Sequence, residues 1–86
     1  LIGGNVKLGN NIRKLRFQAG EMTQANLARG IGVTRQTIIS LEKGKYIPST
    51  LLALKMADFF EVMVEDIFFI LKEENKTERS GNDEKE

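Results

Sequence analysis

The stretch TQANLARGIGVTRQTIISLEKGK, residues 23–45, contains two short helical patterns separated by a glycine turn. Each pattern begins with a threonine, Thr23 or Thr34, whose side-chain oxygen can cap the first turn of a helix. Apolar residues then recur at three- or four-residue spacing and give each helix one buried stripe: Leu27, Ala28 and Ile31, then Ile38 and Leu41. The pattern predicts helices over 24–30 and 35–43, joined through a turn at 32–33.

The second of these helices carries polar side chains away from its apolar stripe. They are Arg35, Gln36, Thr37 and Ser40, residue types that hydrogen-bond to base edges and to phosphate oxygens. This combination is typical of a helix-turn-helix unit that binds double-stranded DNA.

The charge distribution favours the same interpretation, although the formal net charge is only +1. Residues 1–45 hold eight Lys or Arg against Glu21 and Glu42, a net of +6, whereas residues 46–71 carry −3 and residues 72–86 carry −2. The positive field therefore lies on the half with the candidate recognition helix, as expected for a nucleic-acid partner.

Composition argues against an enzyme and against a metal site. The chain has no cysteine and no histidine, so it lacks thiolate ligands and the commonest general base. The remaining acid–base candidates are carboxylates on exposed helix faces, where such groups are solvated: Asp58, Glu61, Glu65 and Asp66. We expect no catalytic residue, no metal, no cofactor and no small-molecule ligand that the sequence could identify.

No membrane segment is expected, because the longest apolar run, residues 67–71, is far too short to span a bilayer. No signal-peptide pattern opens the sequence, so we expect a cytoplasmic protein.

The chain divides into three parts on this interpretation. Residues 1–7 are an N-terminal extension or tag remnant, residues 8–71 are the folded domain, and residues 72–86 are a charged, disordered tail. Further helices are predicted over 8–19, 50–60 and 65–71, which makes the domain all-α with five helices. The core side of the fourth helix is predicted to hold Ala53, Leu54, Ala57 and Phe60.

Three charged residues of the first helix lead to different expectations. Arg16 directly follows core Leu15 and can reach Glu42 near the end of the recognition helix as a structural ion pair. Arg13 and Lys14 are either a solvated face or phosphate contacts, and the sequence does not decide between the two.

More apolar residues are present than one five-helix core can bury. Such a surplus marks an interface or results from a wrong helical phase. A homodimer explains it economically, with an interface that contains Leu51, Phe59, Met63, Phe69 and Ile70.

The span from about residue 11 to residue 68 resembles the Cro/repressor-type helix-turn-helix family, also called the Xre family. The motifs are IRKLR, TQANLA, IGVTRQTI, LEKGKYIPS, ALKMADFF and VEDIF, in the family's usual order. The resemblance implies a compact five-helix, lambda-repressor-like DNA-binding domain, with the second and third helices as the reading unit. It also implies a dimer on an inverted repeat.

The resemblance further implies roles for single positions. Base contacts are expected from Arg35, Gln36, Ser40 and Gln24, and phosphate contacts from Thr23, Thr34, Thr37, Lys43, Lys45 and Tyr46. Ile39 either touches a thymine methyl group or is simply exposed. The sequence departs from the family pattern at Glu21, an apparent insertion, at Glu61, where glycine is common, and at Met63, where a capping hydroxyl is common.

The function expected from these observations is a sequence-specific transcriptional regulator, and a repressor in particular. The alternative is a protein-interaction module, such as an antitoxin or adaptor, that uses the same fold without binding DNA.

Overall fold

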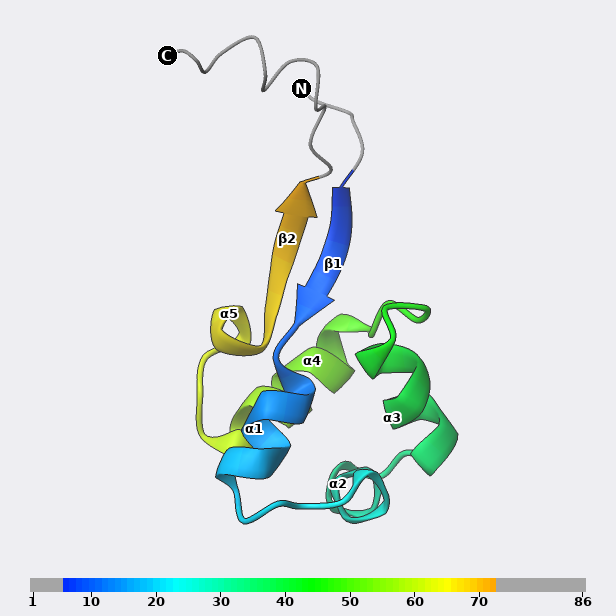
Figure 1. The fold of residues 1–86 in the computed structure, drawn as a ribbon, viewed down its shortest axis with the longest axis vertical. Helices are drawn as coiled ribbons and strands as arrows, with labels where there is room; N and C mark the ends of the chain where they lie inside the picture. Colours follow the sequence, from blue (N-terminus) through cyan, green and yellow to red (C-terminus); the bar gives the residue numbers. More distant parts are fainter. Residues whose placement is uncertain (1–5, 73–86) are drawn as a thin grey trace, which may run out of the picture.

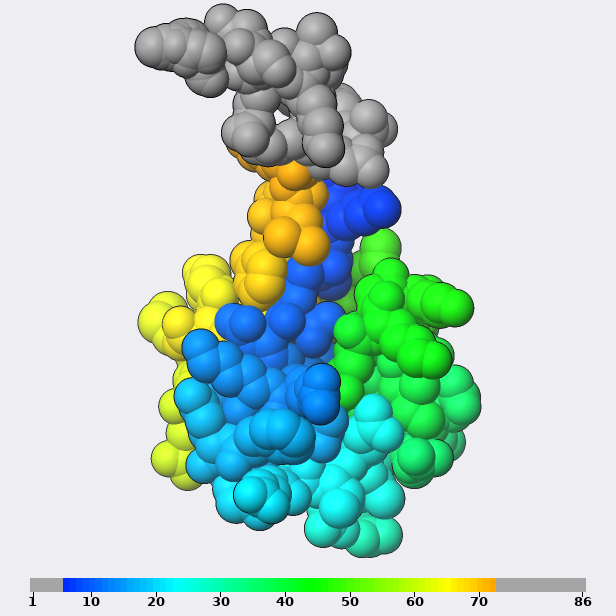
Figure 2. All heavy atoms as spheres, viewed as in Figure 1, coloured from blue at the N-terminus to red at the C-terminus, as the bar shows by residue number. Residues whose placement is uncertain are grey.

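The computed structural model describes residues 6–72. Its elements, in chain order, are β1 (Val6–Asn10), α1 (Ile12–Gln18), α2 (Gln24–Ile31), α3 (Arg35–Glu42), α4 (Thr50–Phe60), α5 (Val64–Ile67) and β2 (Phe68–Lys72). The helices form a bundle, and the two strands form a ribbon that projects from it (Figures 1 and 2). Every helix in this part of the chain is too short or too polar to cross a lipid bilayer.

The core of the bundle draws on every helix. Its fully buried side chains are Ile12, Leu27, Ile38, Leu41, Met56 and Ile67. Because α1 to α5 each contribute at least one of them, no helix can be moved without exposing apolar surface to water. The core therefore fixes α2 and α3 against the other three helices.

The all-α expectation is wrong in one respect, because the chain contains a two-stranded antiparallel sheet. The first helix begins at Ile12 instead of residue 8, and the fifth ends at Ile67 instead of residue 71. Glycine at position 9 disfavours a helix there, and the run Phe68–Leu71 consists of aromatic, β-branched and aliphatic residues that suit a strand. The expectations for residues 1–5 and 73–86 lie outside the described residues.

The ribbon pairs Val6 with Lys72 and Asn10 with Phe68. Gly9 is opposite Phe69, and a Cβ atom at Gly9 would lie 2.4 Å from the Phe69 ring. The ring therefore covers a position that only glycine can occupy without displacement. The β1 strand begins at Val6. Val6 and Lys7, which the sequence predicts to belong to the N-terminal extension, are therefore part of the folded region.

Asparagines connect the base of the ribbon to the bundle. The Asn10 side chain accepts a hydrogen bond from the Ile12 amide at 3.1 Å and donates one to the Leu41 carbonyl at 3.0 Å. Asn11 donates its backbone N–H to the Ile67 carbonyl at 2.8 Å. These bonds start α1 and hold the end of α3 and the end of α5 beside it.

The α4 helix has the expected ends and part of the expected core face, because Ala57 is buried and Ala53 and Phe60 pack half-buried against the core. Leu52 and Met56 are buried, whereas Leu54, predicted for the core, is 53% exposed. The helix is apolar on most of its circumference, so periodicity alone does not determine which face is buried. Ser49 caps it by accepting a hydrogen bond from the Leu52 amide at 3.0 Å.

Candidate nucleic-acid interface

The two helices of the candidate DNA-reading unit are positioned by local backbone chemistry. Thr23 accepts a hydrogen bond from the Asn26 amide at 3.0 Å and starts α2, and Thr34 accepts one from the Thr37 amide at 3.2 Å and starts α3. Between them Gly32 has a left-handed backbone with φ +79°, which glycine adopts without strain. The sequence therefore determines the angle between α2 and α3 mainly through two caps and one turn.

The α3 helix presents a polar face to solvent and an apolar face to the core. Ile38 and Leu41 are buried, Arg35 and Gln36 are exposed, and Thr37, Ile39 and Ser40 are half-buried. Gln36 and Ser40 lie within 3.4 Å of each other through Nε2 and Oγ. Gln36 and Ser40 therefore lie side by side on one face of α3, one helical turn apart.

Two of the expected phosphate-binding residues lie beside this face. A shallow groove of about 270 Å³ is lined by Thr34, Gln36, Thr37, Ser40, Lys45 and Tyr46. Lys45 and Tyr46 follow α3 in sequence, and the turn at Gly44 brings them back alongside Ser40. The groove thus combines two expected base contacts with four expected phosphate contacts.

Arg35 and Gln24 lie on the other side of α3 from this groove. They line a second groove of about 730 Å³ between α1, α2 and α3, together with Thr23, Arg13, Phe17 and others. The four residues expected to contact bases therefore fall into two pairs, Gln36 with Ser40 and Arg35 with Gln24. Ile39 is half-buried, so only part of its side chain is accessible to a thymine methyl group.

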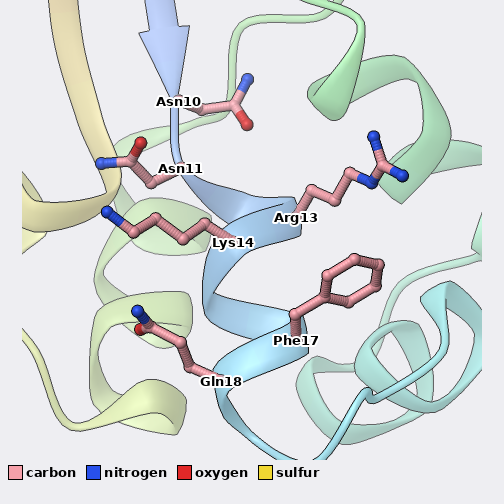
Figure 3. Close-up of a pocket in the computed structure, with 6 residues that line it drawn as sticks. All are labelled: Asn10, Asn11, Arg13, Lys14, Phe17 and Gln18. Atoms are coloured by element: carbon pink, nitrogen blue, oxygen red, sulfur yellow. The ribbon is translucent and has the colours of Figure 1, made fainter.

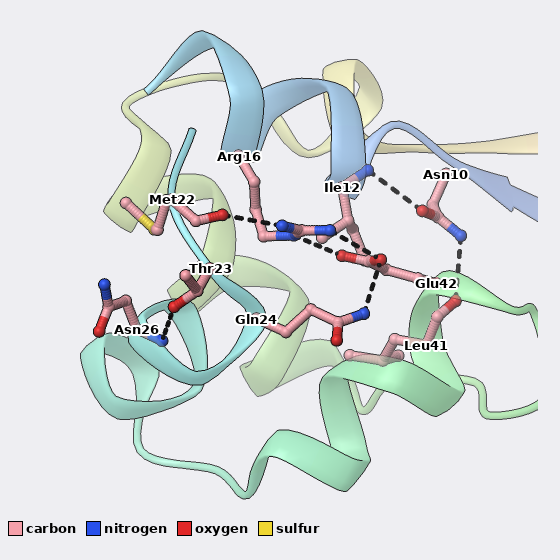
Figure 4. Close-up of polar contacts among 9 residues, drawn as sticks. All are labelled: Asn10, Ile12, Arg16, Met22, Thr23, Gln24, Asn26, Leu41 and Glu42. Carbon is pink, nitrogen blue, oxygen red and sulfur yellow. Dashed lines mark hydrogen bonds and ion pairs between the residues drawn. The ribbon is translucent and has the colours of Figure 1, made fainter. Parts of the chain in front are cut away.

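Arg16 and Glu42 form a two-pronged ion pair between α1 and the end of α3 (Figure 4). Arg16 Nε donates to one oxygen of Glu42 at 2.7 Å and Nη2 to the other at 3.1 Å. Arg16 also donates to the Met22 carbonyl at 2.8 Å. Because the two side chains are only 8% and 11% exposed, the pair is largely removed from water.

Gln24 belongs to the same network, which the sequence does not indicate. Its side-chain amide donates to Glu42 at 3.1 Å, so Glu42 accepts hydrogen bonds from both α1 and α2 (Figure 4). The amide oxygen of Gln24 takes no part in that bond. The oxygen could accept a hydrogen bond from a base edge, whereas a phosphate could be contacted only through the second N–H of the amide.

The interface carries no free negative charge. Glu42 is the only carboxylate between residues 24 and 46, and its oxygens accept hydrogen bonds from Arg16 and Gln24. Arg35, Lys43 and Lys45 are exposed on the same stretch. A polyanion approaching α3 therefore meets positive charge without a competing carboxylate.

The residues expected at a dimer interface are all exposed, to different degrees. Leu51, Met63 and Ile70 are 65–66% exposed, whereas Phe59 and Phe69 are each 37% exposed. The two phenylalanine rings lie over glycines of the same chain, Gly30 and Gly9, which accounts for their greater burial. An apolar groove of about 300 Å³ lies near Leu51, and it is lined by Leu8, Ile47, Pro48, Leu54, Val64, Phe68 and three small residues.

Known proteins share both this sequence pattern and this fold. A family model described as helix-turn-helix matches residues 12–67. The chain is 47% identical over 66 residues to the uncharacterised HTH-type transcriptional regulator YgzD of Bacillus subtilis, covering 77% of this chain and 97% of that protein. It is 62% identical over 47 residues to the uncharacterised HTH-type transcriptional regulator MJ0272 of Methanocaldococcus jannaschii, covering 55% of this chain and 71% of that protein.

Solved structures of transcription regulators share a similar fold. The transcriptional regulator VanUg matches with a TM-score of 0.70 at 23% identity, over 85% of this chain and 96% of that chain, a likeness of fold alone. The restriction-modification controller protein C.AhdI from Aeromonas hydrophila matches with a TM-score of 0.58 at 27% identity, over 65% of this chain and 80% of that chain. The chain therefore belongs to the Xre-type helix-turn-helix family of transcriptional regulators.

Proposed function

We propose that this protein binds double-stranded DNA sequence-specifically as a homodimer on an inverted-repeat operator, and that it acts as a repressor. The observation that carries the proposal is the exposed face of α3, where Arg35, Gln36 and Ser40 stand among basic residues with no free carboxylate. Such a face suits the major groove, whose base edges offer both hydrogen-bond donors and acceptors.

In the proposed complex α3 enters the major groove. Arg35 donates two hydrogen bonds to a guanine, and Gln36 pairs with an adenine. Ser40 and Gln24 contact bases at the two sides of the helix. Six side chains hold the register on phosphates, namely Thr23, Thr34, Thr37, Lys43, Lys45 and Tyr46.

The homodimer is supported by exposed apolar surface on the α4 helix and the ribbon. Leu51, Met63 and Ile70 each leave about two thirds of their side chains in water, and Ile47 leaves 74%. A contact between two subunits that covers these side chains would remove their apolar surface from water. Two α3 helices related by a two-fold axis would read half-sites about one helical turn apart, ~10 base pairs.

Repression is the proposed output because a protein bound across an operator excludes polymerase from overlapping promoter DNA. This mechanism needs only the DNA-reading unit and the dimer contact. It requires no further surface for a ligand or for polymerase.

The test is a selection of bound sequences from a random duplex pool. The proposal predicts a palindrome whose half-sites lie ~10 base pairs apart. An enriched sequence without internal symmetry would contradict the homodimer but not DNA binding.

The exposed apolar surface also favours a second candidate, the interaction module that does not bind DNA. A gel shift separates the two, because a helix-turn-helix reader binds even non-specific duplex at low salt. Absence of any shift at about 50 mM salt would favour the module over the regulator.

A further inference from the structure

Arg13 lies outside the helix-turn-helix unit but faces the same groove as Arg35. Figure 3 shows Arg13 and Phe17 on the side of α1 that is turned toward α3, with Lys14 and Gln18 on the opposite side. Arg13 and Arg35 both line the groove of about 730 Å³ between α1, α2 and α3. The orientation of α1 therefore separates two adjacent cations, Arg13 and Lys14, that the sequence alone does not distinguish.

The groove has an excess of positive charge that the protein itself does not neutralise. Three arginines line it against one carboxylate, Glu42. That carboxylate is already bonded to Arg16 and Gln24. Among residues 6–72, Arg13 forms no ion pair. An anion that enters the groove would therefore be attracted by the positive charges of Arg13 and Arg35.

Phe17 gives Arg13 a defined position. The Arg13 guanidinium carbon lies 5.3 Å from the centre of the Phe17 ring, one helical turn away, which is a cation–π distance. The ring is 51% exposed, so it forms a surface platform and is not part of the core. A guanidinium held in this way loses less rotational freedom on binding than a free arginine side chain.

We propose that Arg13 is an additional DNA-phosphate contact, with Phe17 as the residue that positions it. The contact rests on the proposed DNA binding and extends the bound surface from the helix-turn-helix unit onto α1. Thr23, an expected phosphate contact, lines the same groove. A phosphate bound at Thr23 would therefore occupy a groove that Arg13 also lines.

The test compares Arg13→Ala with Lys14→Ala, a matched control that removes the same charge one residue away on the other side of α1. Binding to the selected operator duplex is measured by fluorescence anisotropy from about 50 to 300 mM NaCl. We expect Arg13→Ala to lower the magnitude of the log–log salt slope by about 1.8, the value for two phosphates, because each proposed homodimer carries two copies of Arg13; Lys14→Ala should leave the slope unchanged. At about 0.1 M salt the loss in affinity of the dimer should be roughly 60-fold for Arg13→Ala.

Phe17→Leu tests the positioning role in wild-type and Arg13→Ala backgrounds. In the wild type it should weaken binding a few-fold while the salt slope stays the same. In the Arg13→Ala background it should have no effect, whereas a merely structural role for Phe17 would weaken binding equally in both. Arg13→Lys should restore the salt slope, because it keeps the charge.

Equal slope changes in Arg13→Ala and Lys14→Ala, or no change in either, would overturn the proposal. A Phe17→Leu effect that persists without Arg13 would overturn the positioning role. Thermal unfolding of each variant shows whether it is folded at the assay temperature. If the wild type itself binds no duplex at low salt, the proposed function fails. If the wild type binds but Arg13→Ala has the same salt slope as the wild type, only the Arg13 contact fails.

Discussion

Replacement of Glu42 by alanine should destabilise the domain far more than the loss of one surface ion pair. Arg16 is 7% exposed, and without Glu42 its guanidinium keeps only the Met22 carbonyl as a protein acceptor. Removal of one partner from a buried pair costs about 3–5 kcal/mol, because the other charge stays out of water without a partner. At about 4–8 °C per kcal/mol for a domain of this size, even the lower figure lowers Tm by roughly 12–24 °C.

The assay is urea unfolding followed by circular dichroism, at one protein concentration because dimerisation would make stability concentration-dependent. Arg16→Met should cost a similar amount, because it leaves the Glu42 carboxylate with only the Gln24 amide. The double variant Arg16→Met with Glu42→Leu should recover most of the loss. Replacing both members of a buried pair by apolar side chains is often neutral or stabilising by about 1–4 kcal/mol.

The reasoning fails if Glu42→Ala loses less than about 1 kcal/mol, the usual ceiling for an exposed pair. It also fails if the double variant loses the sum of the losses of its two single variants, Arg16→Met and Glu42→Leu, since additive effects would mean that the two side chains do not interact. In either case the packing of α1 against α3 would depend on the apolar core alone.

Three further predictions concern other parts of the molecule. Arg35→Ala should cost about 1–3 kcal/mol of binding and relax the preference at one base position in a binding-site selection, whereas Lys45→Ala should weaken all sequences alike; an unchanged selected site would contradict the base assignment. Glu61 has a left-handed backbone with φ +59° at the end of α4, so Glu61→Gly should relieve about 1–2 kcal/mol of strain. Glycine also costs ~0.5–1 kcal/mol of stability, because it loses more conformational freedom on folding than glutamate does. The net effect should be a small rise in the thermal midpoint. Glu65→Gly inside α5 is its control and should lower the midpoint instead. Ile70→Lys should shift a dimer to monomer in sedimentation equilibrium, because it places two like charges on the proposed interface, and an unaffected dimer would place that interface elsewhere.

The bounds of α2, α3 and α4 could be predicted from the sequence because their ends depend on local chemistry. Thr23, Thr34 and Ser49 each accept a hydrogen bond from an amide three residues later, and a pattern of that range is visible in the sequence. The sequence also predicts an ion pair between Arg16 and Glu42 from their positions along two helices. In the structure the Arg16 Nε atom lies 2.7 Å from a carboxylate oxygen of Glu42.

The ribbon could not be predicted because it depends on pairing between distant segments. Val6 is paired with Lys72, and neither strand alone carries a turn signal that would show it. The burial of Leu52 in place of Leu54 could not be predicted for a related reason, since the two leucines are equally apolar and only tertiary packing chooses between them. The orientation of Arg13 toward Arg35 likewise follows from how α1 lies against α3, so residue types alone left its role open.

The ribbon has a consequence for the order in which the molecule assembles. Joining residues as far apart in sequence as Val6 and Lys72 costs about 4 kcal/mol of loop-closure entropy in an unfolded chain, whereas α2 and α3 meet across a turn of a few residues. Local contacts form earlier than distant ones, so α2 and α3 should pack together first, and the ribbon, with the contact between α1 and α5 at its base, should form last. By the same reasoning the strands should open first, and their amide hydrogens should exchange with water sooner than those of α2 and α3.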